Sequence, residues 1–407
     1  MSLFIAGILS VAGSLVVPFF QVRETRVSTG HGLSLGLASP GFTVGLVVWA
    51  ILAIWTLATR RSSRAGDRGV RRPQRVAPAL LDACAVAIGP LVMMALADGS
   101  TRIAGGLPLM ARVSFGPGLW LALAGAWLCA MGNGRRVQPG LAARRTVSAL
   151  ALAASAGAGI VLALSGAFSS LGMARELSSR AALVATAFAE HMAYAFLPTL
   201  LAAMIALPLG KASINKAWVE KPLFFTAAIA QTVPTLSLLG LLVLPLSALR
   251  TAVPALKAIG FSGTGWAPAS IALFLYALLP LASTARAGFA LVSPAAVEAA
   301  TGLGMSGRQV FLKVELPLAA PALIAGFRTA LAQNLGNAVL AGLIGGGGLG
   351  GVLFLGLAQA APDLVYLGAL PVAAAALAVD GSLSWAESVA SRNAGQQRAD
   401  ELKEAVA

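Results

Sequence analysis

Long apolar runs, separated by short polar or charged segments, recur along the whole chain. A helix needs about 20 mostly apolar residues to cross the bilayer core, whereas a membrane β-barrel would show short segments of alternating hydrophobicity. The pattern therefore predicts an all-α polytopic membrane protein with about ten transmembrane helices. The ten candidate spans are 2–20, 41–59, 76–97, 116–131, 146–167, 191–210, 222–246, 267–290, 318–344 and 364–384.

Composition agrees with this pattern, because 58% of the residues are hydrophobic and only 11% are charged. These values exclude an ordinary soluble enzyme and a disordered chain. The net charge of +14 would suggest a nucleic-acid partner for a soluble protein. In a membrane protein the basic residues are better explained by topology and by contact with phospholipids. We therefore expect membrane lipids, and no nucleic acid, as partners.

Topology follows from the position of the arginines. Residues 60–75 contain seven arginines and join the second and third candidate spans. Placing this segment inside predicts a bacterial inner-membrane protein with both termini in the cytoplasm. The first span carries no basic residue before it, so we expect a retained span rather than a cleaved signal peptide. Its own flank, with Arg23 and Arg26, favours the opposite orientation.

Chemical motifs for catalysis or metal binding are absent from the sequence. Cys84 and Cys129 both lie in apolar runs and are interpreted as packing residues. We recognise no set of nucleophile, base and orienting residue, so we expect neither an enzyme nor a metal site. The phosphate-binding pattern G-x-x-x-x-G-K-[ST] does not occur. The glycines at 345–348 lack the lysine of such a loop and are better explained by a hinge or close backbone packing.

One motif stands out between the eighth and ninth spans, at residues 292–317. It reads Glu298-Ala299-Ala300, three residues, Gly304, nine residues, then Val314-Glu315-Leu316-Pro317. This pattern resembles the EAA loop of ABC importer permeases, with Val314 where the family has isoleucine. Pro294 can open a helix, and Gly302 and Gly304 can end it, so we expect a short helix, a turn and a second short helix.

The resemblance implies that this loop docks onto a cytoplasmic ABC ATPase. The coupling residues that it implies are Glu298, Ala299, Ala300, Gly304, Leu316 and Pro317. Since the chain has no phosphate-binding loop of its own, ATP would be used by a partner subunit, and we expect no cofactor in this chain.

A wider resemblance covers about half of the chain. Residues 190–384 resemble the permease subunit of osmoprotectant importers of the glycine betaine, carnitine and choline type, in the stretches 208–210, 231–240, 275–280, the EAA loop and 341–350. Methionine-type permeases share several of these stretches. Residues before 175 are similar to an extended subgroup often called YehY-like.

This resemblance predicts three parts and several partners. The parts are a membrane extension of about five transmembrane helices at 1–175, a type I permease core like that of methionine importers at 176–390, and a cytoplasmic tail at 391–407. The implied partners are ABC ATPase subunits, a periplasmic or lipid-anchored solute-binding protein, and a second permease chain.

Polar residues inside the spans are candidates for the solute path, because they are costly to expose to lipid. They are Gln231, Thr232, Tyr276, Gln333, Asn334 and Asn337. Interhelical hydrogen bonds that merely hold the bundle explain each of them at least as well. Aromatic residues are only 6% of the chain, so tight recognition of a quaternary ammonium, which aromatic faces favour, is assigned to the binding protein.

Other charged and titratable residues leave several interpretations open. Asp82, Arg328 and Asp380 are candidates for pairing within the membrane. His191 beside Glu190 suggests a pH-sensitive pair, although a histidine solvated by lipid headgroups is the commoner explanation.

The leading prediction is thus an importer permease for a compatible solute such as glycine betaine. The alternatives are an ABC permease for another small solute, such as an amino acid or methionine, an ion-coupled secondary transporter that uses Asp82 and Asp380, and a membrane scaffold or sensor that does not transport.

Overall fold

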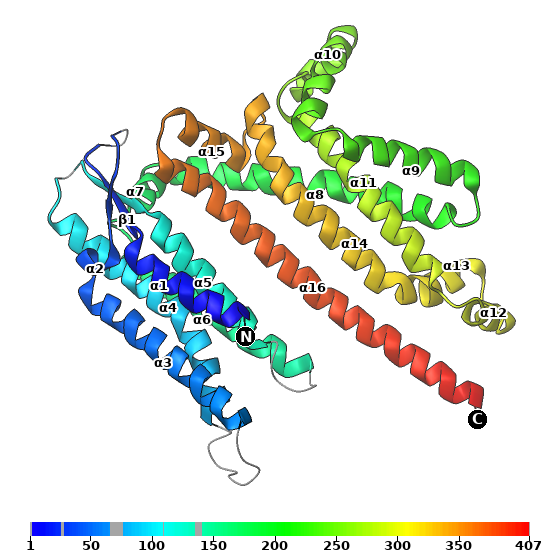
Figure 1. The fold of residues 1–407 in the computed structure, drawn as a ribbon. Helices are drawn as coiled ribbons and strands as arrows, with labels where there is room; N and C mark the ends of the chain where they lie inside the picture. Colours follow the sequence, from blue (N-terminus) through cyan, green and yellow to red (C-terminus); the bar gives the residue numbers. More distant parts are fainter. Residues whose placement is uncertain (1, 26–27, 66–75, 109, 135–140, 407) are drawn as a thin grey trace. The chain divides into compact units, whose positions relative to one another are not determined.

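The computed structural model describes residues 2–25, 28–65, 76–108, 110–134 and 141–406. The chain divides into two compact units (Figure 1). Unit 1 contains Met1–Ser179 together with Gln359–Asp363, and unit 2 contains Arg180–Ala358 and Leu364–Ala407. The arginines predicted to mark the cytoplasmic side, at 60–75, lie outside the residues whose side chains are described.

Unit 1 is built from helices that carry a small sheet. The helices are α1 (Ser2–Val16), α2 (Leu35–Ala38), α3 (Pro40–Ala65), α4 (Val76–Gly105), α5 (Pro117–Gly134), α6 (Leu141–Leu164) and α7 (Gly172–Ser179). The strands β1 (Phe20–Arg23), β2 (His31–Leu33) and β3 (Arg112–Phe115) form an antiparallel sheet in the order β2-β1-β3. The sequence pattern does not predict this sheet, because strands of three or four residues are too short to show a period.

Small residues let α1 and α5 approach closely. A Cβ atom on Gly7 would lie 2.8 Å from the carbonyl oxygen of Gly125 and 2.6 Å from Cys129 Sγ. Close backbone approach through glycine is a common way to join helices where no hydrophobic effect drives them together. Cys129 is fully buried, which agrees with its interpretation as a packing residue.

The segment between α15 (Gly348–Ala358) and α16 (Pro362–Val406) is held in unit 1 by polar contacts. Ser114 Oγ donates to Asp363 Oδ1 at 2.8 Å, and Arg23 donates to the carbonyl oxygen of Ala360 at 3.2 Å. Arg112 forms an ion pair with Glu176 at 2.9 Å. The sheet therefore supplies hydrogen-bonding groups for a buried carboxylate.

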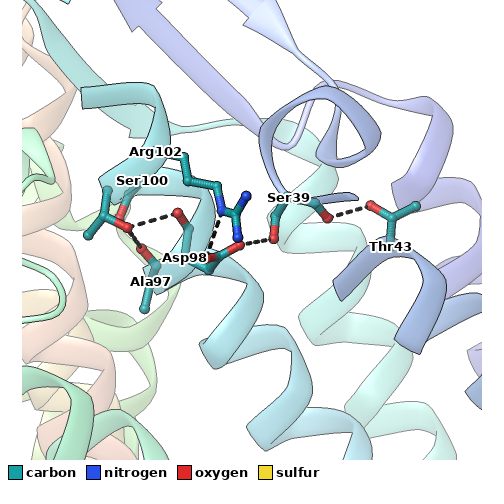
Figure 2. Close-up of polar contacts among 7 residues, drawn as sticks. Ser39, Thr43, Ala97, Asp98, Ser100 and Arg102 are labelled. Atoms are coloured by element: carbon teal, nitrogen blue, oxygen red, sulfur yellow. Dashed lines mark hydrogen bonds and ion pairs between the residues drawn. The ribbon is translucent and has the colours of Figure 1, made fainter. Parts of the chain in front are cut away.

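A second polar cluster joins the turn between α2 and α3 to α4 (Figure 2). Ser39 Oγ donates to Asp98 Oδ2, while Arg102 Nε donates to Asp98 Oδ1 at 2.8 Å. Thr43 Oγ1 donates to the carbonyl oxygen of Ser39 at 2.9 Å. The Asp98 carboxylate thus ties the turn at Ser39 to α4.

The regular structure of unit 2 is helical throughout its described residues. It contains α8 (Ala181–Ala212), α9 (Ala217–Thr232), α10 (Thr235–Ala252), η1 (Pro254–Ile259), α11 (Trp266–Ala290), α12 (Pro294–Gly302), α13 (Gly307–Val310), the π-helical turn η2 (Phe311–Glu315), α14 (Leu316–Asn337), η3 (Ala338–Ile344), α15 and most of α16. In Figure 1, α11 lies against both α8 and α14.

The core of unit 2 consists mainly of alanines around Leu281. A buried cluster contains Ala202, Ala203, Ala206, Ala227, Ala277, Leu278, Leu281, Ala282 and Ala330. Gly210 packs against the carbonyl oxygen of Ala282, where a Cβ atom would lie only 2.7 Å away. Small side chains at these contacts bring the helix backbones together.

Six helical segments among the described residues are long and apolar enough to cross a membrane, and five further apolar helices have 10–17 residues. The multi-pass helical architecture is therefore confirmed, but the number of ten spans is not. The predicted span 222–246 contains the helix break that Pro234 can cause. It is divided into α9 and α10 at Val233 and Pro234, because proline lacks the amide proton that a helix interior requires.

The glycine-rich segment, residues 342–351, shows close backbone packing. A Cβ atom on Gly350 would overlap the carbonyl oxygen of Val339, whereas nothing lies within 4 Å of the corresponding position on Gly351. A side chain can therefore be accommodated at Gly351 but not at Gly350.

We predict that Gly350→Ala destabilises the protein by about 1–3 kcal/mol, the usual cost of overpacking. Gly351→Ala, the matched control, should change stability by a few tenths of a kcal/mol at most. Thermal unfolding of the detergent-solubilised protein, followed by tryptophan fluorescence, measures both. Equal midpoints for the two variants would contradict the packing described.

Candidate functional site

The first half of the EAA loop (residues 292–317) folds as its sequence predicts. The helix α12 begins at Pro294 and ends at Gly302. Gly304 has φ of 80°, and the amide of Met305 donates to the carbonyl oxygen of Ala300 at 3.2 Å. A glycine in the left-handed region is the usual way to end a helix and reverse the chain. The predicted helix and turn are confirmed.

The second half contains the predicted second short helix, α13 (Gly307–Val310), but this helix does not end separately. Ser306 and Gln309 form a reciprocal capping box that starts α13. From there the chain continues without a break through the π-helical turn η2 into α14. The loop is therefore a direct extension of a long apolar helix, and its movement would be transmitted along that helix.

Exposure divides the motif residues into two groups. Glu298, Ala299 and Gly304 are exposed, whereas Ala300 is buried and Leu316 and Pro317 are half-buried. The exposed group is available to a partner, and the other group packs the loop against its own unit. Sequence reasoning missed Leu303, an apolar side chain that is 80% exposed at the end of α12.

A cation joins the loop to the end of α8. Lys211 forms an ion pair with Glu315, and its Nζ lies 4.3 Å from the ring centroid of Phe311 and 5.3 Å from that of Phe289. The two rings stack on each other at 6.0 Å. Ion pairing and cation–π attraction thus act on the same ammonium group. We call Lys211, Phe289, Phe311 and Glu315 the Lys211 cluster.

A second ion pair ties α11 to α9 near the same end of the unit. Arg286 pairs with Glu220, and its guanidinium lies 5.7 Å from the ring centroid of Phe224. Neither pair was predictable from sequence, because the partners are separated by 104 and 66 residues. The first pair links the end of the loop to α8, and the second links α11 to α9.

Three of the polar candidates lie near the break between α9 and α10. Gln231 Nε2 donates to the carbonyl oxygen of Tyr276 at 2.7 Å, and the hydroxyl of Tyr276 donates to the carbonyl oxygen of Val233 at 2.6 Å. Thr232 is exposed, and its hydroxyl donates to the carbonyl oxygen of Ile229. The hydroxyl of Tyr276 therefore satisfies a backbone carbonyl at the helix break, whereas Gln231 satisfies a carbonyl inside α11.

The candidates on α14 differ in burial and in hydrogen bonding. Asn334 is fully buried, and its Nδ2 donates to Thr199 Oγ1 at 2.8 Å and to the carbonyl oxygen of Leu273 at 3.0 Å. This residue holds α8, α11 and α14 together. Gln333 and Asn337 are half-buried, and their side chains form no hydrogen bond within the described part of the chain.

Two further sequence interpretations are changed or completed by the structure. The interpretation of His191 as solvated by headgroups is wrong, since the residue is fully buried and its Nε2 lies 3.0 Å from the carbonyl oxygen of Leu335. Arg328 pairs with Asp380 at 3.4 Å and also with Glu387 at 3.1 Å. That ion-paired group is partly exposed rather than buried.

Comparison with known proteins gives two family matches. Residues 198–388 match the family described as "Binding-protein-dependent transport system inner membrane component", and residues 1–174 match "ABC transporter permease YehY, N-terminal domain". These ranges cover the EAA loop and most of unit 1, respectively.

Individual proteins are similar to about half of the chain. The choline transport system permease protein OpuBB of Bacillus subtilis is 34% identical over 213 residues, which is 52% of this chain and 90% of that protein. The osmoprotectant import permease protein OsmW of Salmonella typhimurium is 32% identical over 191 residues, 47% of this chain and 84% of that protein. A solved chain of the methionine ABC transporter MetNI has a TM-score of 0.41 and 19% identity, over 49% of this chain and 93% of that one.

We predict that Lys211→Glu and Glu315→Lys each lower the thermal stability of the protein, and that the double variant recovers part of the loss. The reason is that the swap restores opposite charges, with a coupling energy of about 1 kcal/mol. Lys216→Glu, an exposed lysine at the start of α9, is the control for the change in net charge. Strictly additive losses in the double variant would show that the ion pair does not hold the loop.

Proposed function

This chain belongs to the family of binding-protein-dependent transport system inner membrane components, and from that membership we propose that it carries a quaternary-ammonium compatible solute across the membrane. It is the permease subunit of an ABC importer and a multi-pass protein of the inner membrane. It is not an enzyme, because ATP is hydrolysed by a separate subunit. A permease of this kind works with an ATPase, a solute-binding protein and a second permease chain.

The observation that carries the choice of solute is the similarity to the choline permease of Bacillus subtilis, which this chain matches over 90% of its length. Other relatives at 31–33% identity are named for transport of glycine betaine, carnitine and choline or of carnitine. All these solutes carry a trimethylammonium group. We therefore propose glycine betaine or a chemically similar solute for this chain.

Coupling to ATP is proposed to begin at the exposed face of α12. Glu298 lies in the middle of this short helix, where its exposed carboxylate can meet a basic residue of the ATPase, and the exposed Leu303 can fill an apolar groove on the same partner. Movement of the docked loop would pass directly into α14. The Lys211 cluster would carry it to α8 at the same time.

The solute path is proposed to run along the face of α14 that carries Gln333 and Asn337. These residues are four positions apart, so they lie on one side of the helix. Polar side chains without a partner in the membrane are expected to face water or another protein chain. We propose that this face lines a path completed by the second permease chain, with both termini in the cytoplasm.

The other functions considered have weaker support. A permease for an amino acid would use the same coupling loop and differ only in its path. An ion-coupled transporter would require a titratable carboxylate free to exchange its ion, whereas Asp380 pairs with Arg328 and Asp82 also has an interaction partner.

We predict that Glu298→Lys lowers ATP-dependent uptake about tenfold or more, because losing a charge-assisted contact costs about 1.5–3 kcal/mol. The assay reconstitutes the permease with its ATPase and binding protein in proteoliposomes and measures uptake of radiolabelled glycine betaine. Glu24→Lys makes the same change at an exposed glutamate outside the loop and should leave uptake unchanged. Full uptake by Glu298→Lys would contradict docking through this residue.

The same assay tests the solute. Uptake of glycine betaine that requires both ATP and the binding protein would support the proposal. If the binding protein stimulates ATP hydrolysis but no betaine, choline or carnitine enters, the proposed solute class is wrong and the permease assignment stands.

A further inference from the structure

A cavity of about 570 Å³ lies between the first turns of α8 and the start of α15. Its wall is mostly apolar and includes Leu183, Ala187, Val352 and Leu355. Glu190 is the one charged residue among the described residues that line it. No aromatic side chain occurs among these lining residues. The cavity therefore combines one carboxylate with a surface suited to methyl groups.

This cavity lies at the end of the unit opposite to the EAA loop. Glu190 precedes Lys211 on the same helix by 21 positions, which corresponds to roughly 30 Å of helix length. Lys211 contacts the loop that faces the ATPase. Glu190 is thus about one bilayer core away, on the side from which a binding protein would deliver solute.

The glycine-rich segment is shaped around the Glu190 carboxylate. Glu190 Oε2 accepts a hydrogen bond from the amide of Gly348 at 2.7 Å. Gly347 has φ of 76°, and a Cβ atom at that position would lie 2.5 Å from Glu190 Oε2. A residue with a side chain would be strained there and would also displace the carboxylate. The glycines therefore make room for a negative charge.

The charge of Glu190 is held in position but is not neutralised. Within the described chain, Glu190 forms no ion pair with a lysine, arginine or histidine. The neighbouring His191 directs its Nε2 to Leu335, and Tyr194 donates its hydroxyl to the carbonyl oxygen of Gly346. Glu190 is exposed in this open, mostly apolar pocket, so its uncompensated carboxylate is accessible to a cationic partner.

We infer that this cavity is a binding site for the quaternary ammonium group of the solute, with Glu190 as its counter-charge. The inference rests on the proposed function and adds a place and a residue to it. The carboxylate attracts the cation, while the apolar wall contacts its methyl groups. Because no aromatic cage is present among the lining residues, binding is weak and lets the solute move on.

A purely structural role for Glu190, as an acceptor at the start of α15, makes a different prediction. Glutamine keeps a carbonyl oxygen that can accept from Gly348 but removes the charge, whereas alanine removes both. If Glu190 only supports α15, Glu190→Gln should behave like the parent. If it is the counter-charge, the Glu190→Gln variant should bind a quaternary ammonium cation much more weakly than the parent.

Thiol labelling measures the site without relying on transport. Thr186 lines the cavity one helical turn before Glu190. A Thr186→Cys variant is prepared in a parent that carries Cys84→Ala and Cys129→Ala, and the full-length chain is placed in lipid nanodiscs. The rate of reaction with a trimethylammonium methanethiosulfonate is compared with the rate for an anionic one. We expect the ratio of the cationic rate to the anionic rate to be about fivefold or more higher with Glu190 than with Glu190→Gln, because the carboxylate attracts the cation.

Protection by a probe tests binding directly. Tetramethylammonium chloride should slow the labelling of the thiol introduced by Thr186→Cys in the presence of Glu190 and should have little effect with Glu190→Gln, while sodium chloride at equal ionic strength serves as the control. Equal protection in both variants, or none in either, would overturn the inference. Labelling that occurs in detergent but not in nanodiscs would show that a lipid fills the cavity, which also overturns it.

These outcomes are separable from those of the proposed function. Betaine uptake without tetramethylammonium protection would reject the site and keep the solute class. Protection that depends on Glu190, without betaine uptake, would keep a cation site and reject the proposed solutes.

Discussion

The close approach of α8, α11 and α14 is the constraint on which the rest of unit 2 depends. Between transmembrane helices no hydrophobic effect drives association, so packing of small residues and interhelical hydrogen bonds have to supply it. Gly210 meets the backbone of Ala282, Gly288 meets Ala322, and Asn334 bonds to the two helices beside it. Larger side chains at these positions would separate the helices and misplace both ends of α8.

The helix α8 therefore connects two sites of different chemistry. At one end Lys211 binds the extension of the EAA loop through Glu315 and two stacked rings, and at the other end Glu190 meets the glycine-rich segment. A helix transmits displacement along its axis because its backbone hydrogen bonds are internal. This arrangement provides a direct physical route from ATP-driven movement to the proposed solute site.

Much of the EAA loop was predictable because its signals are local. Pro294 and Gly304 act through their own backbone geometry, so the bounds of α12 follow from neighbouring residues. The same is true of the break at Pro234, because proline lacks the amide proton that a helix interior requires. By contrast, the exposure of Leu303 and the burial of Ala300 depend on which side of α12 faces the unit, and apolar periodicity over nine residues cannot decide this.

By itself the sequence determined the multi-pass helical class, the position of the EAA loop and the family, because length, hydropathy and motif spacing are properties of contiguous residues. Only the tertiary structure decided which polar residues hold the bundle and which remain available. Asn334 and Asn337 lie three positions apart on one helix, yet the first is fully buried, whereas the second is half-buried and its side chain forms no hydrogen bond within the described part of the chain. The partners of Lys211, His191 and Glu190 are more than 100 residues away, and their contacts are set by helix packing, which no local pattern encodes.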